Sequence, residues 1–176
     1  MNNRTNHKKL TLSEVDEWIE EWRLPLGPFK MVEEIYESMA LKAEELGDDD
    51  ATVLASYAAK VGQKEGAHVE VLSLFLQEYA ALHGQAFADA LLDELGAEGP
   101  PLLVDLLGAT RQETVISAMS EILDLKKANE ALLVAWACAL GEIKGGQAKK
   151  LLLELKSQID LPLAVVKEAE IALENI

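Results

Sequence analysis

Histidine and cysteine, the residue types that most often carry chemistry, are few and widely spaced in this sequence. The histidines are His7, His68 and His83, and the single cysteine is Cys138. No His-x-x-x-His or Cys-x-x-Cys pair occurs, so the clusters that build zinc sites are not predicted. We expect Cys138, which stands among alanines, to be an inert core thiol. We expect His83 to place a favourable charge at a helix C-terminus.

Two stretches resemble ligand-binding loops in composition only. Asp48, Asp49 and Asp50 lack the alternate spacing, the glycine and the glutamate of a calcium loop, so we expect a helix cap with solvated acids. The string G-E-I-K-G-G-Q-A-K-K, residues 141–150, has Gln147 where a phosphate loop requires lysine. The sequence therefore predicts no metal site, no cofactor and no catalytic residue, which is typical of a protein that is not an enzyme.

The acidic residues are unevenly distributed along the chain. The net charge is −15, and residues 10–60 hold 13 acids against 4 bases, while residues 111–176 hold 10 against 8. An acidic surface repels nucleic acid and anionic lipid and attracts a basic protein. We therefore expect a basic protein partner, with no nucleic acid and no membrane. An acidic surface that serves only solubility is the alternative.

The candidate partner-binding residues lie where acids are least compensated by bases. They fall on the outer face of the second expected helix and at the end of that helix. These residues are Glu33, Glu34, Glu37, Asp48, Asp49 and Asp50.

The elements that must position these residues are helices. The apolar residues are mainly Leu, Ala, Val and Ile, and they recur at helical spacing between Gly and Pro breaks. Ser13 with Asp16 predicts a capping box for the first helix, and Thr110 with Glu113 predicts another. Asn129 is expected to cap a later helix. The break before the second helix and the start of the last helix are assigned to four residues: Pro25, Gly27, Pro28 and Pro162.

One sequence pattern occurs twice near the end of the chain. A-L-L-V-A-W-A-C-A-L-G-E-I, residues 131–143, and A-V-V-K-E-A-E-I-A-L-E-N-I, residues 164–176, both end in A-L-x-x-I and lie 33 residues apart. One more step back reaches Leu107 and Gly108, so Leu107, Leu140 and Leu173 share a register. A period of this length with two helices per unit is typical of an α-solenoid. The alternative is an irregular helical bundle whose last helices echo by chance.

The strings A-C-A-L-G-E-I, L-L-L-E-L and V-V-K-E-A-E-I-A-L-E-N-I resemble the HEAT-like repeats of the armadillo type. Lys167 occupies the basic place of that pattern, and Glu174 replaces the usual glycine, as in a terminal repeat. The resemblance covers 130–176 well, 100–123 loosely and 10–99 hardly at all. It implies an all-α fold, a right-handed α-α superhelix or short HEAT-like solenoid of about ten helices. We expect a flexible basic tail at 1–9 and one domain at 10–176, with an acidic half (10–99) and a repeat half (100–176).

An acidic helical stack without a visible catalytic group favours a non-enzymatic interaction protein. Our leading hypothesis is an inhibitor or immunity protein that blocks a basic protein such as a cognate nuclease toxin. The resemblance also implies one alternative, a bilin lyase or chromophore carrier. A structural adaptor subunit of a larger assembly is a third possibility. The single cysteine, the lack of an apolar run behind the N-terminal basic residues and the lack of a membrane-length apolar run predict a cytoplasmic location.

Overall fold

The computed structural model describes residues 9–23, 32–64, 66–158 and 160–176. Residues 1–8 of the expected tail at 1–9, and the break at Pro25, Gly27 and Pro28, lie outside the described residues. Within them the chain forms ten α-helices and one 3-10 turn, and it forms no strand, which confirms the all-α prediction. The elements are α1 Leu12–Arg23, α2 Val32–Glu45, η1 Asp48–Asp50, α3 Ala51–Val61, α4 Ala67–Leu82, α5 Gly84–Glu94, α6 Pro101–Ala109, α7 Val115–Ile122, α8 Glu130–Ile143, α9 Gly145–Lys156 and α10 Leu163–Glu174.

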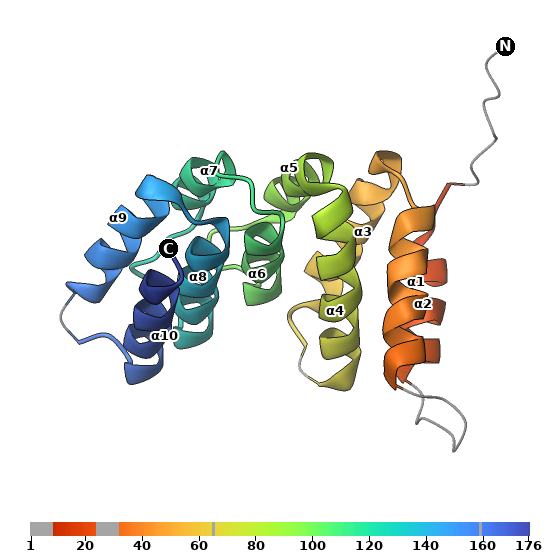
Figure 1. The fold of residues 1–176 in the computed structure, drawn as a ribbon, viewed down its shortest axis with the longest axis horizontal. Coiled ribbons are helices and arrows are strands. Elements are labelled where there is room, and N and C mark those ends of the chain that lie inside the picture. Colours follow the sequence, from red (N-terminus) through yellow and green to blue (C-terminus); the bar gives the residue numbers. More distant parts are fainter. Residues whose placement is uncertain (1–8, 24–31, 65, 159) are drawn as a thin grey trace, which may run out of the picture.

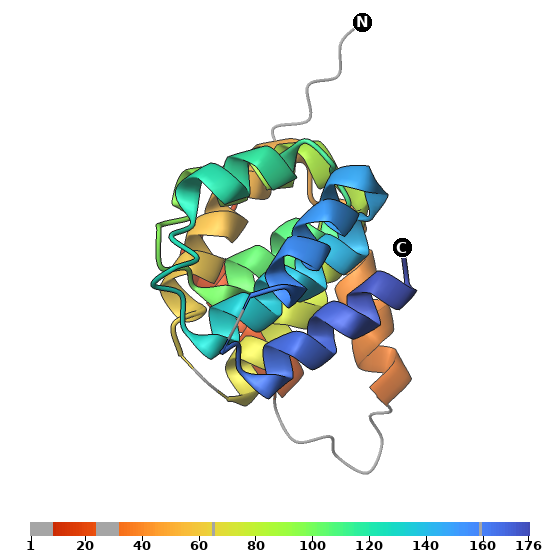
Figure 2. The ribbon, with the colours of Figure 1, turned by 90° about the vertical axis from the view of Figure 1, so that its left-hand side faces the viewer.

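The helices stack in sequence order into a solenoid-like array (Figure 1). One row runs α2, α4, α6, α8 and α10, each helix packed on the next. A second row runs α3, α5 and α7, and α6 packs against both α3 and α5. Helix α9 covers α8 and α10, and the end view shows these three helices in front of the rest of the stack (Figure 2). Among the described residues no helix is both long enough and apolar enough to cross a membrane.

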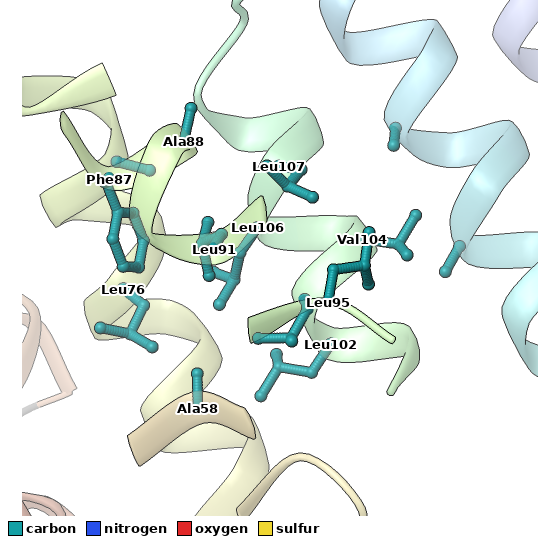
Figure 3. Close-up of a cluster of buried hydrophobic side chains, with 14 of the residues drawn as sticks. Ala58, Leu76, Phe87, Ala88, Leu91, Leu95, Leu102, Val104, Leu106 and Leu107 are labelled. Atoms are coloured by element: carbon teal, nitrogen blue, oxygen red, sulfur yellow. The ribbon is translucent and has the colours of Figure 1, made fainter. Parts of the chain in front are cut away.

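The buried apolar side chains form one continuous cluster from Leu10 to Ala172. Figure 3 shows its central part, where Leu76 of α4, Phe87 and Leu91 of α5 and Leu106 of α6 converge. Each residue faces inward because its helix repeats an apolar position every three or four residues. The acidic half and the repeat half therefore share a core.

The 33-residue echo corresponds to a recurring contact between helices. A Cβ built on Gly108 of α6 would lie 2.6 Å from the Cα of Ala139 on α8. One repeat later, a Cβ on Gly141 of α8 would lie 2.8 Å from the Cβ of Ala172 on α10. The register recurs at the helix ends, because Arg111 (φ 53°) and Lys144 (φ 65°) both leave their helices in the left-handed region. The echo is thus a structural repeat and not a coincidence of composition.

Replacing Gly108 with alanine should destabilise the protein, although alanine is the better helix former. The new methyl group meets the backbone of Ala139, so α6 and α8 must move apart, at a cost of about 1–3 kcal/mol. Gly146 is the matched control, because a Cβ there meets nothing within 4 Å. Thermal unfolding of both variants measures the difference, and equal melting temperatures would refute the close approach.

The helix caps confirm one sequence prediction and correct two others. Asn129 caps α8 as expected, since its Oδ1 accepts the Leu132 N–H at 2.9 Å. The capping box of α1 is formed by Thr11 and Glu14, not by Ser13 and Asp16. Glu14 accepts the Thr11 N–H at 3.0 Å, and Thr11 Oγ1 accepts the Glu14 N–H at 3.3 Å. The reason is that a glutamate reaches back to the cap residue, whereas Asp16 is used elsewhere as an acceptor for Tyr57.

The second expected capping box, Thr110 with Glu113, is also wrong. Helix α7 begins only at Val115, five residues beyond Thr110. Thr110 is buried and closes the preceding helix instead, because its hydroxyl donates to the Leu107 carbonyl at 2.7 Å. A threonine side chain satisfies a helix C-terminus as readily as an N-terminus, so the sequence alone did not distinguish the two roles.

Candidate functional site: an acidic helix face and a groove

The predicted acids on α2 lie on its exposed side. Helix α2 buries only Met39 and Ala43, so most of its circumference faces solvent. Glu33, Glu34 and Glu37 are all exposed, as the sequence predicted. Sequence reasoning missed the apolar residues and the further acid beside them. We define the α2 face as Glu33, Tyr36, Glu37, Leu41 and Glu44, in which Tyr36 is 47% and Leu41 54% exposed.

The charges of the α2 face are not compensated within the described residues. Glu33, Glu37 and Glu44 form no hydrogen bond or ion pair there. Lys42, the one base of α2, forms an ion pair with Glu45 and lies 5.0 Å from the centre of the Trp18 ring. The α2 face is therefore an acidic surface with exposed apolar side chains, a combination that suits a protein interface.

Two of the three predicted aspartates at the end of α2 have structural roles. Asp50 accepts the Gly47 N–H at 3.0 Å and so closes the 3-10 turn. Asp48 lies 2.7 Å from Nδ1 of His83, which is the C-terminal cap residue of α4, the position that the sequence predicted for it. Tyr79 donates to the Gly47 carbonyl at 2.7 Å, and burial, followed by the nearby aspartates, raises the pKa of Tyr79. This junction anchors α2 to α4.

Asp49 is exposed and takes part neither in the turn at Gly47 nor in the contact with His83. It lines a 520 Å³ hollow with Glu44, Glu45 and Asp50, and Lys9 stands at the edge. Glu44 therefore belongs both to the hollow and to the α2 face. The five acids within residues 44–50 were the sequence signal for this place. Glu44 therefore lies between the predicted glutamates of α2 and the predicted aspartates that follow this helix.

A polar chain that the sequence did not predict ties α1 to α3 and α4. Tyr57 donates to Asp16 Oδ1, and its hydroxyl lies 2.8 Å from Nε2 of His68. His68 Nδ1 lies 3.1 Å from Glu20, which also accepts from Arg23. Burial, followed by the hydrogen bond to Asp16, raises the pKa of Tyr57, so its phenol stays protonated at neutral pH. The chain of hydrogen bonds is thus a structural link between α1, α3 and α4.

A groove lies on the row of helices that contains α4, α6 and α8. Helix α6 has 9 residues, whereas α4 has 16 and α8 has 14, so the short helix leaves a hollow of 870 Å³ between its neighbours. Apolar residues form much of its surface: Val69, Leu74, Pro100, Pro101, Leu102 and Ala131. Acids stand around them, namely Glu70, Glu98 and Asp105. Lys64 is the one base that lines the groove within the described residues.

Asp105 in this groove faces further carboxylates on the next two helices of the row. Burial, followed by Glu142 of α8 and Glu168 of α10, raises its pKa to about 6. None of the three carboxylates has an ion-pair partner in the described part of the chain. The neighbouring Cys138 is half-buried, and burial with the same carboxylates raises the pKa of its thiol to about 11. The thiol of Cys138 therefore stays protonated at neutral pH, and Cys138 is less buried than expected.

Asp105 should make the stability of the protein depend on pH. Because its pKa is higher in the folded state than the ordinary 3.8, the folded state binds more protons between about pH 4 and pH 6. Stability therefore falls as the pH rises through this window. Asp105→Asn should remove that dependence and stabilise the protein at pH 7 by about 1–3 kcal/mol. Urea unfolding of both proteins from pH 4 to 7 measures the effect, and a constant difference across the series would contradict it.

No group of three or more His, Cys, Asp or Glu residues in the described ranges is arranged to hold a metal ion. Comparisons of the chain with protein-family models, curated proteins and solved structures give no match.

Proposed function

We propose that this chain is a HEAT-like helical-repeat protein that binds a basic protein through its acidic half and blocks the partner's active surface. The observation that carries the proposal is the α2 face, where three exposed glutamates that form no ion pair with any described residue lie beside exposed Tyr36 and Leu41. Apolar contacts supply affinity at such a surface, and the charges supply steering and partner choice.

Inhibition of a nuclease toxin is the role that this chemistry fits best. A nuclease must present a basic site to the phosphate backbone, and that site complements an acidic helix face. Covering the site requires shape and charge only, so the inhibitor needs no catalytic group. Tyr57, Tyr79 and His68 support this role, because their hydrogen bonds join the helices α1 through α4 without using the residues of the α2 face.

Capture of the partner from the native cell tests the proposal. The tagged chain is used as bait at low salt, and the captured proteins are eluted with rising salt. We expect a basic protein that elutes as the salt screens the interface and whose nuclease activity the pure chain inhibits. A captured partner that is acidic, that resists salt or whose activity is unchanged by the chain would exclude an inhibitor of this type.

The exposed apolar residues at the other end of the stack favour a structural adaptor as the second candidate function. Leu163 and Ile171 of α10 are 68% and 52% exposed, and Leu153 of α9 is 53% exposed. An adaptor would bury them against a subunit of a larger assembly. A chain that co-purifies in stoichiometric amount at high salt would favour this function over inhibition.

A further inference from the structure

We propose that the groove over α6 is a second binding surface, which takes an extended peptide segment carrying a lysine or arginine between aliphatic residues, with the cation at Asp105. This surface is separate from the α2 face and does not depend on the inhibitor function. The argument rests on the shape, the composition and the charge of the groove.

The shape arises from the unequal lengths of three neighbouring helices. Helix α6 is flanked by the longer α4 and α8, so its half-buried ridge forms a floor between two walls. Pro101 and Asp105 lie one turn apart on that ridge. Leu74 contributes an exposed apolar side chain to the α4 wall. Ala131 lines the α8 wall, and its side chain is too small to close the groove. A hollow of 870 Å³ accommodates a few side chains of an extended segment.

The charge of the groove selects a cationic ligand. Glu70, Glu98 and Asp105 line it against Lys64, the one base in the described lining. Glu142 and Glu168 act on Asp105 from a neighbouring hollow, which Arg111 and Lys144 also line. Burial and the nearby carboxylates disfavour the ionised form of Asp105, and a ligand cation beside it would relieve that cost. An unfavourable charge arrangement retained inside a groove is typical of a binding site.

The helix start in the groove does not reverse this preference. A helix N-terminus attracts anions through its free N–H groups. At α6, Pro101 is the first helical residue and has no N–H, and Pro100 before it has none either. At α8, the Asn129 side chain already accepts the Leu132 N–H. An anionic ligand would thus find few donors there, and it would face three carboxylates.

Selection from a displayed library of random peptides tests the inference with the full chain as bait. We expect enriched peptides to contain a lysine or arginine flanked by aliphatic residues. Synthetic copies of these peptides should bind Asp105→Asn at least tenfold more weakly, because the charge-assisted contact at the floor of the groove is lost. They should also bind Leu74→Gln more weakly, since the apolar wall contributes independently.

Two control variants keep the result unambiguous. Asp93→Asn removes an exposed carboxylate of α5 outside the groove and should leave binding unchanged. Glu37→Lys alters the α2 face and should also leave it unchanged, which separates this inference from the proposed inhibitor function. Thermal unfolding confirms that each variant is folded, and Asp105→Asn should be no less stable than the wild type. Failure to enrich peptides, enrichment without a basic residue, equal affinity for Asp105→Asn or no effect of Leu74→Gln would each overturn the inference.

Discussion

Replacing Leu140 with alanine is expected to lower the free energy of unfolding by about 2–5 kcal/mol. Leu140 lies on α8, between α6 and α10, is fully buried and precedes Gly141, where α8 lies close to α10. Removing its side chain leaves a cavity between helices whose backbones already touch. The close contacts prevent those helices from collapsing into the space, so the cost should lie in the upper part of the range for leucine truncations.

The equivalent positions in the other repeats provide an internal comparison. Leu107 is also fully buried, whereas Leu173 on α10, the last helix of the described row, is only partly buried. Leu107→Ala should therefore match Leu140→Ala, and Leu173→Ala should cost clearly less. Leu153→Ala, at an exposed position, should change stability by less than about 0.5 kcal/mol. Urea unfolding gives all four values, and a similar loss at Leu140 and Leu153 would show that the repeat contact is energetically unimportant.

The sequence was informative about the repeat because close helix packing demands particular residues at particular places. Gly108 and Gly141 recur at the period of the stack, as do Ala139 and Ala172, since no larger side chain fits the contact. Helix ends were less predictable, because a threonine caps either the following or the preceding helix. Thr110 closes α6, although its spacing to Glu113 fits an N-terminal box.

The candidate binding surfaces were also predictable from the sequence only in part. The exposure of Glu33 and Glu37 could be predicted, because charged residues on the polar side of an amphipathic helix face solvent. The structural roles of Asp48 and Asp50 could not, since they depend on His83 and on a turn that only the folded chain forms. The groove could not be predicted from the sequence either, because it depends on the relative lengths of α4, α6 and α8, which are neighbours only in the folded chain.

Charge reversal of the α2 face is the prediction that bears most directly on the proposed function. The structure selects Glu33, Glu37 and Glu44 for this variant, because all three are exposed and form no ion pair within the described ranges. Reversal of Asp48 and Asp50 would disturb the contact with His83 and the turn at Gly47, so a loss of binding there would have two explanations. A control variant carries the same change in net charge elsewhere, at Asp93, Glu121 and Glu174, which are all exposed.

Binding kinetics with the captured basic partner should then separate local complementarity from overall charge. At low salt we expect the α2 variant, with its three glutamates changed to lysine, to associate about 10–100-fold more slowly than the wild type, because the local field now repels the partner. The control variant should lose much less, since its changed residues lie far from the docking surface. Screening shortens the reach of each charge to about 8 Å near physiological salt, so the association rates should converge as salt rises. The dissociation rate should change less than the association rate, because charges at the rim of an interface act mainly on the encounter. Equal association rates of the two variants across the salt series would mean that the partner responds to net charge alone, and the α2 face would then not be the binding surface.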